Sequence, residues 1–212
     1  MPTYVHLVRH AQGFHNLSAV NHQIPDPDLT PLGKSQCEEL CKKFPYHDQI
    51  THLVASPMRR TLYTCLLSFE PAVKAGKKVI ALQEIQEVSC LPCDTGSSTE
   101  KLAAEFDASQ TDLSLIQPGW NDKGRNGPWA PDMHKLEARA KKARNFFRTL
   151  GSQVKDGDAH IVAVTHGGFL HFLTQDWDGM DIEKGRSRNR GPPSETCCRS
   201  SARLTTNFCE IL

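Results

Sequence analysis

Apolar and polar positions along this chain form blocks that change period, from continuous apolar runs to helical spacing. Four runs rich in Val, Ile, Leu and Ala are predicted to be buried strands, at residues 3–8, 51–56, 78–82 and 159–165. Amphipathic helices are predicted at residues 32–44, 57–69, 99–107, 134–150 and 169–174. Strands that alternate with helices predict an α/β fold with three layers, in which helices cover both faces of a mostly parallel sheet.

Three segments lack either period and are predicted to be loops, at residues 10–31, 89–98 and 117–133. The last contains three Pro, three Gly and two Trp, namely Trp120 and Trp129. It is predicted to be either a lid insertion that closes over a substrate or a surface connection that its tryptophans anchor.

The end of the chain differs in composition from the rest. Residues 184–212 carry six Lys or Arg against two acidic residues, a net charge of +4, whereas the whole chain has a net charge of +1. We therefore assign residues 1–185 to one catalytic domain and residues 186–212 to a basic, atypical tail with a short strand around Leu204–Phe208.

The overall balance of charge argues against nucleic acid or a membrane surface as a partner. The first residues lack the basic region and apolar core of a signal peptide, and no run approaches the roughly 18 apolar residues of a membrane span. Eight cysteines without such a signal predict free thiols in a reducing, cytoplasmic location. This reading is favoured over a redox or zinc role for Cys90 and Cys93, which no second pair with zinc spacing accompanies.

Polar side chains follow two of the predicted strands. Arg9 and His10 come after the first strand, and His166 and Gly167 follow strand 159–165. Ligands of open α/β sheets bind at the carboxyl ends of strands. Two histidines and an arginine at this edge predict an anionic, phosphoryl substrate. A neutral imidazole such as that of His10 can attack phosphorus, because its reference pKa lies near 6.5.

Two further positions supply charged groups. Arg59 and Arg60 lie where a strand meets a helix, and one of them should face the site, because a guanidinium fork matches phosphate oxygens. Glu87 follows the third strand and is a candidate acid for protonating a leaving oxygen, with Glu84 as a competing candidate. Repulsion from a nearby phosphate would raise the pKa of either carboxyl.

Five motifs, in order along residues 4–185, resemble those of the histidine phosphatase superfamily, which has the phosphoglycerate-mutase-like fold. They are Arg9-His10-Ala11, Leu29–Gln36, Ser56–Thr61, Gln86-Glu87-Val88 and Val164–Gly168. The register of this resemblance favours Arg60 over Arg59 and Glu87 over Glu84. The segment Gln12–Asn16 is similar to a subgroup of small mutase-like proteins of fungi and plants.

The resemblance implies a two-step phosphoryl transfer without metal or cofactor. His10 attacks phosphorus, Glu87 protonates the leaving alkoxide, and water then hydrolyses the phosphohistidine. The groups expected to hold the phosphoryl group are Arg9, Asn16, Arg60, His166 and Gly167. The expected substrate rim comprises Gln12, His15, Trp120 and Trp129, with His15 either an additional cation or a surface histidine.

These observations predict a phosphatase for a small soluble organic phosphate ester. Three alternatives stay open: a phosphoglycerate mutase, a non-catalytic phosphoryl-binding module, and a family member recruited to a reaction of secondary metabolism. A phosphatase would release phosphate from its substrate, whereas a phosphoglycerate mutase would isomerise the substrate. The presence of both His10 and Glu87 argues against the binding module.

Overall fold

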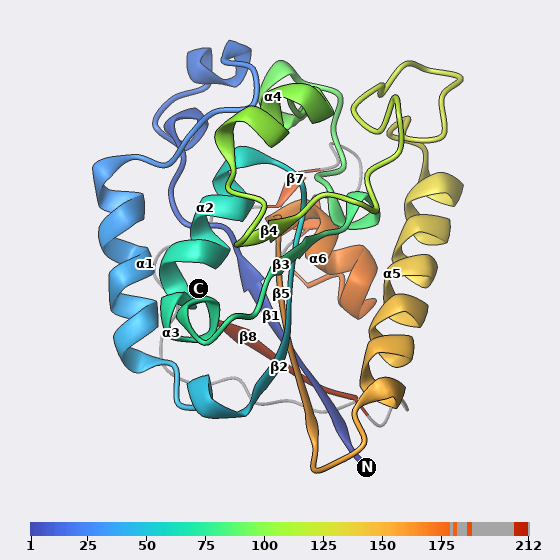
Figure 1. Ribbon diagram of the computed structural model, residues 1–212. Coiled ribbons are helices and arrows are strands. Elements are labelled where there is room, and N and C mark those ends of the chain that lie inside the picture. The colour runs from blue at the N-terminus through green and yellow to red at the C-terminus, as the bar shows by residue number, and fades with distance from the viewer. Residues whose placement is uncertain (179, 182–185, 188–205, 212) are drawn as a thin grey trace.

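The computed structural model describes residues 1–178, 180–181, 186–187 and 206–211 of the chain. Its centre is a six-stranded sheet in the order β4-β3-β2-β5-β1-β8, in which all neighbouring strands are parallel (Figure 1). The strands are β1 (Thr3–Arg9), β2 (Ile50–Ala55), β3 (Val79–Ala81), β4 (Thr111–Asp112), β5 (Ala159–Thr165) and β8 (Thr206–Ile211). Strands β6 (Met180–Asp181) and β7 (Arg186–Ser187) form a separate antiparallel pair.

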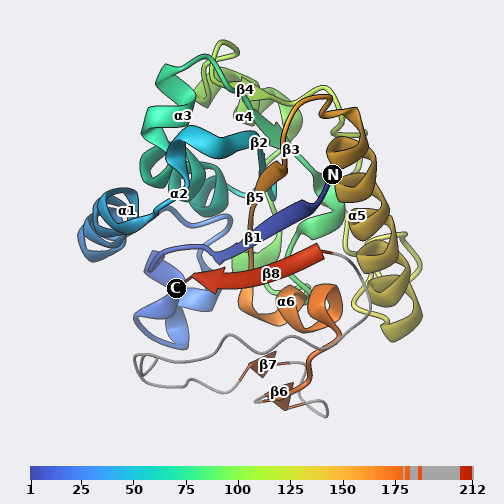
Figure 2. The same ribbon diagram turned by 90° about the horizontal axis from the view of Figure 1, so that it is seen from below.

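Helices cover both faces of the sheet, which confirms the predicted three layers. Helices α1, α2 and α3 lie on one side, and α5 and α6 lie on the other (Figure 2). Their bounds are α1 (Pro31–Lys43), α2 (Arg59–Ser68), α3 (Glu70–Lys74), α4 (Thr99–Glu105), α5 (Met133–Gln153) and α6 (Gly167–Thr174). Short 3-10 helices are η1 (Phe14–Asn16), η2 (Val20–Gln23), η3 (His47–Gln49), η4 (Gln83–Ile85) and η5 (Pro92–Asp94).

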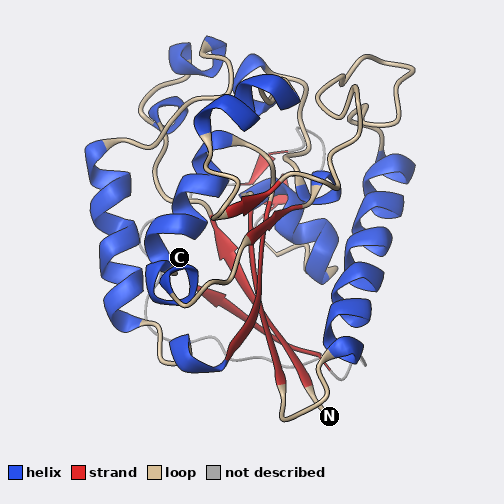
Figure 3. Cartoon of the chain, in the orientation of Figure 1, coloured by secondary structure: helices blue, strands red, loops and turns tan. Residues whose placement is uncertain are grey.

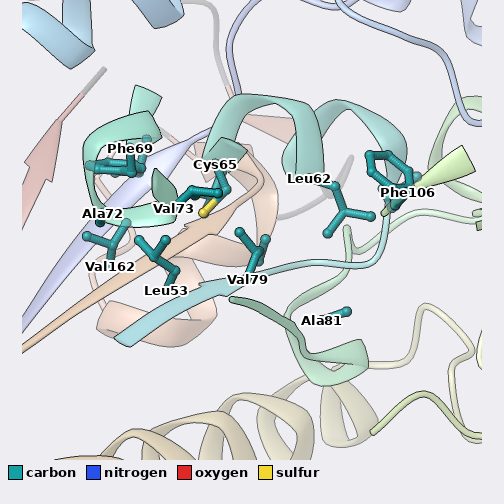
Figure 4. Packing of buried hydrophobic residues seen from close by; sticks show 14 of the residues in the cluster. Leu53, Leu62, Cys65, Phe69, Ala72, Val73, Val79, Ala81, Phe106 and Val162 are labelled. Carbon is teal, nitrogen blue, oxygen red and sulfur yellow. The ribbon is translucent and has the colours of Figure 1, made fainter. Parts of the chain in front are cut away.

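The sheet is buried on both faces, which explains why its strands are continuous apolar runs rather than alternating ones. In β5, Val162 and Val164 pack in the cluster that includes α2 and α3, whereas Ile161 and Ala163 pack in the cluster of α5 and α6. Figure 4 shows the first cluster, in which Leu62 and its neighbours on α2 lie over the strand residues.

Capping residues fix where the helices begin. The side chain of Thr30 accepts a hydrogen bond from the Gly33 amide at the start of α1, and Asp132 caps α5 in the same way through the Lys135 amide. Each cap satisfies an amide that has no partner within its helix. The start of α1 places the loop after β1, because the Thr30 amide also donates to the Gln12 carbonyl at 2.9 Å.

The element boundaries differ from the predicted ones at a few places. Helix α2 begins at Arg59 rather than at residue 57, because Met58 is still extended, with φ −77° and ψ 143°. The five-residue helix α3 and the two-residue strand β4 were not predicted, since both are too short to show a period. Helix α5 continues to Gln153.

The chain end contains a strand close to the one expected around Leu204–Phe208. Strand β8 pairs in parallel with β1, from Thr3 opposite Thr206 to Val8 opposite Ile211, and so forms an edge of the central sheet. These last described residues of the predicted tail therefore contribute a strand to the sheet. The rest of the predicted tail, residues 188–205 and 212, lies outside the described residues.

Loops at one end of the sheet bring the candidate chemistry together. The segments that follow β1, β2, β3 and β5 gather at the upper end of the sheet in Figure 3, where the long irregular segment before α5 also lies. Parallel strands deliver all their carboxyl ends to one edge, so this edge is where the site must form. Within the described residues, no helix is both long and apolar enough to span a bilayer.

Truncation of a core leucine tests the packing of α2. Leu62→Ala should destabilise the protein by about 2–5 kcal/mol, because this fully buried side chain leaves a cavity beneath the helix. Leu67→Ala on the same helix is the matched control, since Leu67 is 38% exposed, and it should cost about 1 kcal/mol or less. Urea unfolding followed by circular dichroism measures both; equal losses would contradict the described packing.

Candidate active site

His10 is held as a neutral imidazole at the carboxyl end of β1. Its amide donates to the Thr165 carbonyl at 2.9 Å, and its Nδ1 donates to the Ala11 carbonyl at 2.8 Å. A carbonyl can only accept, so the proton is on Nδ1 and the lone pair is on Nε2. Burial, followed by the charge of Arg60, lowers the pKa of His10 well below its usual value. The imidazole therefore stays neutral at pH 7.

Arg60, not Arg59, enters the site. The fully buried Arg60 guanidinium donates to the Cys93 carbonyl at 2.6 Å, to Asp94 Oδ1 at 2.9 Å and to His166 Nδ1 at 3.1 Å. Arg59 instead turns outward and pairs with Glu105 at 2.8 Å. The structure therefore agrees with the register of the family motif at this junction.

His166 follows β5 and lies beside His10, with the two ring centroids 5.2 Å apart. Because Arg60 has only donors, His166 Nδ1 must accept, and Nε2 carries the proton that it donates to Ser56 Oγ at 2.9 Å. Burial and the Arg60 charge lower the pKa of His166 well below its usual value. Both ring nitrogens are thus occupied, and His166 orients Arg60 in this structure.

Glu87 lies against the first turn of α6. Its Oε1 accepts from the Val88 amide at 2.8 Å, and its Oε2 accepts from the Gly168 amide at 3.3 Å. A Cβ at Gly168 would lie 2.6 Å from Glu87 Oε1, so the approach requires glycine. Burial, followed by the charge of Asp94, raises the pKa of Glu87, while Arg60 and Lys123 oppose this. A proton retained to higher pH suits a general acid.

Arg9, Asn16 and Gly167 lie around these groups. The Arg9 side chain lies over Gly167, since a Cβ at Gly167 would be 3.2 Å from Arg9 Nε. Gly167 opens α6, where amides have no partner within the helix. Asn16 is exposed, and its Oδ1 accepts from the Gly13 amide at 2.9 Å, which makes Nδ2 the donor available to a ligand.

Of the expected rim residues, the structure corrects Trp120. Trp120 is 1% exposed in the core, where its indole would collide with a Cβ on Gly96 at 2.1 Å, so it cannot line a rim. The Gln12 side chain accepts from the Thr30 hydroxyl at 2.8 Å and so supports the start of α1. The Trp129 side chain is also largely buried.

The segment 117–133 is anchored near its start. Its Trp120 carbonyl accepts from Gln86 Nε2 at 2.9 Å, and Asn121 donates to the Gly96 carbonyl at 2.9 Å. These contacts tie the start of the segment to the loops that follow β3, and the choice between a lid and a surface connection stays a prediction.

His15 is neither a cation nor a surface histidine. Its ring is buried with its centroid 5.3 Å from that of His10. Burial, followed by the charge of Arg60, lowers the pKa of His15 to about 3, so the ring is neutral at pH 7. It places a neutral ring beside His10 instead of a positive charge.

Three residues of the site were missed by the sequence analysis. Asp94 joins Arg60 to the Ser89 hydroxyl, which donates to Asp94 Oδ2 at 2.5 Å. Lys123 and Arg139 donate to main-chain carbonyls near Glu87. Asp94 and Lys123 lie in aperiodic loops and gave no signal. Arg139 interrupts the apolar face of α5, and this was a signal that could have been used.

Comparison with known proteins settles the family. The model of the histidine phosphatase superfamily, branch 1, matches residues 5–211. The chain belongs to this superfamily. Membership supports a phosphatase or other phosphoryl-transfer enzyme, and the match includes the strand β8 at the chain end.

Three similar proteins all have low sequence identity to this chain. "Phosphoglycerate mutase-like protein 1" of Arabidopsis thaliana is 28% identical over 202 residues, covering 78% of this chain and 68% of that protein. "Putative phosphoserine phosphatase 2" of Hydrogenobacter thermophilus is 25% identical over 179 residues, covering 84% of this chain and 80% of that protein. A solved structure called mycobacterial hydrolase 2 shares the fold, with a TM-score of 0.50, 17% identity and coverage of 84% and 73%.

Replacing Asp94 tests the electrostatics of the candidate site. Asp94→Asn should lower the pKa of Glu87, because the negative charge that raises it is lost and the Arg60 charge is no longer compensated. Carbon-13 NMR titration of labelled glutamate carboxyls, assigned with Glu87→Gln, measures the change. Ser89→Ala removes a hydrogen bond to Asp94 but keeps the charge, so its Glu87 pKa should move less. An unchanged or higher pKa in Asp94→Asn would refute the assignment.

Proposed function

We infer that this protein is a metal-independent phosphatase that hydrolyses a small soluble organic phosphate ester through a phosphohistidine on His10. The observation that carries this inference is the pinned tautomer of His10, whose Nδ1 donates to the Ala11 carbonyl and leaves Nε2 unprotonated. No deprotonation is needed before attack, because burial keeps the ring neutral.

In the first step, the His10 Nε2 lone pair forms the N–P bond while the P–O bond to the alcohol breaks. The leaving oxygen takes the proton of Glu87. In the second step, water attacks phosphorus, Glu87 accepts a proton from that water, and the N–P bond breaks to return neutral His10 and phosphate. Each residue is thereby restored at the end of the cycle.

Unpaired donors support phosphoryl binding at this point. Arg60 Nε is buried and has no hydrogen-bond partner among the described residues. Leaving a buried donor without a hydrogen bond costs about 1–3 kcal/mol, and more when the donor belongs to a charged group. A hydrogen bond to a phosphoryl oxygen would remove that cost. Arg9, Asn16 and the Gly167 amide complete the proposed phosphoryl site.

A phosphoglycerate mutase is the second candidate, because the Arabidopsis thaliana relatives have mutase-like names. The Hydrogenobacter thermophilus relative has a phosphatase name. A mutase must return the phosphoryl group to the product before water reaches it, whereas a phosphatase releases it. Phosphate release from 3-phosphoglycerate against isomerisation of that substrate distinguishes the two activities.

The nucleophile is tested with His10→Ala. Turnover of p-nitrophenyl phosphate should fall by about 1,000-fold or more, because the covalent route is lost. His134→Ala at the exposed start of α5 is the control and should match the wild type. Wild-type activity should persist in EDTA. Residual activity of His10→Ala above a tenth of wild type would remove His10 as nucleophile, and loss in EDTA would indicate a metal mechanism.

The acid is tested by the choice of leaving group. Glu87→Gln should lower kcat/KM, which reports the steps up to formation of phospho-His10, by about 100-fold or more for an alkyl phosphate. It should lower kcat/KM for p-nitrophenyl phosphate far less, since nitrophenolate leaves without a proton. Glu84→Gln removes the competing carboxyl and should leave the ratio of the two rates at the wild-type value. If Glu84→Gln changes this ratio and Glu87→Gln does not, the roles are reversed.

A further inference from the structure

The loop that carries Glu87 has its carbonyls bound by two buried cations. Residues 84–89, which we call the acid loop, comprise the end of η4 and the residues that lead to the loop of η5, and they form neither a strand nor an α-helix. Four of their six carbonyl oxygens, those of Glu84, Gln86, Glu87 and Ser89, accept hydrogen bonds from Arg139 or Lys123. The carbonyls of such a loop lack the backbone hydrogen bonds of a helix or sheet, so the side chains of Arg139 and Lys123 donate hydrogen bonds to them instead.

Arg139 binds the loop from α5. It is 3% exposed, its Nε donates to the Glu84 carbonyl at 3.1 Å, and its Nη2 makes a close hydrogen bond to the Gln86 carbonyl. Its guanidinium also lies 4.7 Å from the centroid of the Phe169 ring on α6. Arg139 therefore joins the acid loop to the helix whose Gly168 amide contacts Glu87.

Lys123 binds the same loop from the segment before α5. It is 6% exposed, and its Nζ donates to the Glu87 carbonyl at 2.7 Å and to the Ser89 carbonyl at 2.8 Å. One of these bonds is made to the main chain of the proposed acid itself. Among the described residues, neither Lys123 nor Arg139 forms an ion pair with a carboxylate.

We propose that Lys123 and Arg139 are positioning residues that together fix the Glu87 carboxyl over the site; this rests on the proposed phosphatase function. Burying two cations without carboxylate partners is costly, and their hydrogen bonds converge on one six-residue loop. A proton donor must stay within hydrogen-bond reach of the leaving oxygen, and a displacement of about 1 Å can cost about 100-fold in rate.

The variants Lys123→Met and Arg139→Met remove the bonds and nearly preserve the side-chain volume. Each should lower kcat/KM for an alkyl phosphate by about 10- to 100-fold, because Glu87 loses its position, and should change kcat/KM for p-nitrophenyl phosphate less than about threefold. The comparison uses kcat/KM because hydrolysis of phospho-His10, in which Glu87 acts as a base, is common to both esters and affects kcat for each.

Matched controls come from the same part of the chain. Arg144 also extends from α5 to two carbonyls, those of Phe172 at 2.9 Å and Leu173 at 3.2 Å, and Lys135 donates to the Gly127 carbonyl at 2.8 Å. Neither control binds the acid loop. Arg144→Met and Lys135→Met should therefore leave the ratio of alkyl to aryl turnover at the wild-type value.

A double-mutant cycle with Glu87→Gln decides whether the two cations act through the acid. In the Glu87→Gln background, Lys123→Met and Arg139→Met should cause no further loss with the alkyl ester. Full additivity, or equal slowing of both esters in the single variants, would overturn the proposal.

Amide hydrogen exchange provides a readout that does not depend on turnover. The Val88 and Gly168 amides, which donate to the Glu87 carboxylate, should exchange faster in Lys123→Met and Arg139→Met than in the controls. Unchanged exchange in the Met variants would overturn the proposal, whether or not the wild type releases phosphate. Absence of phosphate release by the wild type would instead refute the proposed function. Lys123→Arg and Arg139→Lys keep hydrogen-bond donors at these positions, so they should stay closer to the wild type in exchange and in the ratio of alkyl to aryl turnover than any variant without donors. A conservative variant that folds but slows both esters equally would overturn the proposal, also where a Met variant does not fold.

Discussion

The buried guanidinium of Arg60 is the charge on which the rest of the site depends. It has only donors and no access to water, so the chain must supply acceptors around it: the Cys93 carbonyl, Asp94 and His166. These contacts join α2, the η5 loop and the end of β5. The same charge helps to lower the pKa of His10, His15 and His166, which keeps all three rings neutral.

Neutral histidines around a fixed cation suit attack on a phosphoryl group. A protonated His10 would have no lone pair at Nε2, so the burial and charge that suppress its protonation also prepare it for attack. Asp94 then has two effects. It pairs with Arg60, and its charge raises the pKa of Glu87. In the proposed mechanism, a single carboxylate thus connects phosphoryl binding to proton transfer.

The layers of the fold could be predicted because apolar positions in the strands and helices follow distinct spacings along the chain. Several side chains of the candidate site could be predicted because they directly follow strands. Arg9, His10 and His166 were found in this way. The choice of Arg60 over Arg59 needed the family motif, since both lie at one helix start. Asp94 and Lys123 lie in loops where only tertiary contacts decide what a side chain meets, and the composition that indicated a rim for Trp120 also fits a buried anchor.

The use of carbonyls rather than carboxylates as partners of Lys123 has a further physical consequence. Burial lowers the pKa of Lys123 below its usual value, so its proton is lost more readily than that of an exposed lysine. An ammonium has three N–H donors and a neutral amine has two, and Lys123 makes two hydrogen bonds, to the Glu87 and Ser89 carbonyls. Loss of its proton therefore leaves both bonds possible and removes only the field that opposes protonation of Glu87. A carboxylate partner would have favoured the charged form of Lys123. The hydrogen bonds from Lys123 to the loop would then always have been accompanied by its positive charge near the Glu87 carboxyl.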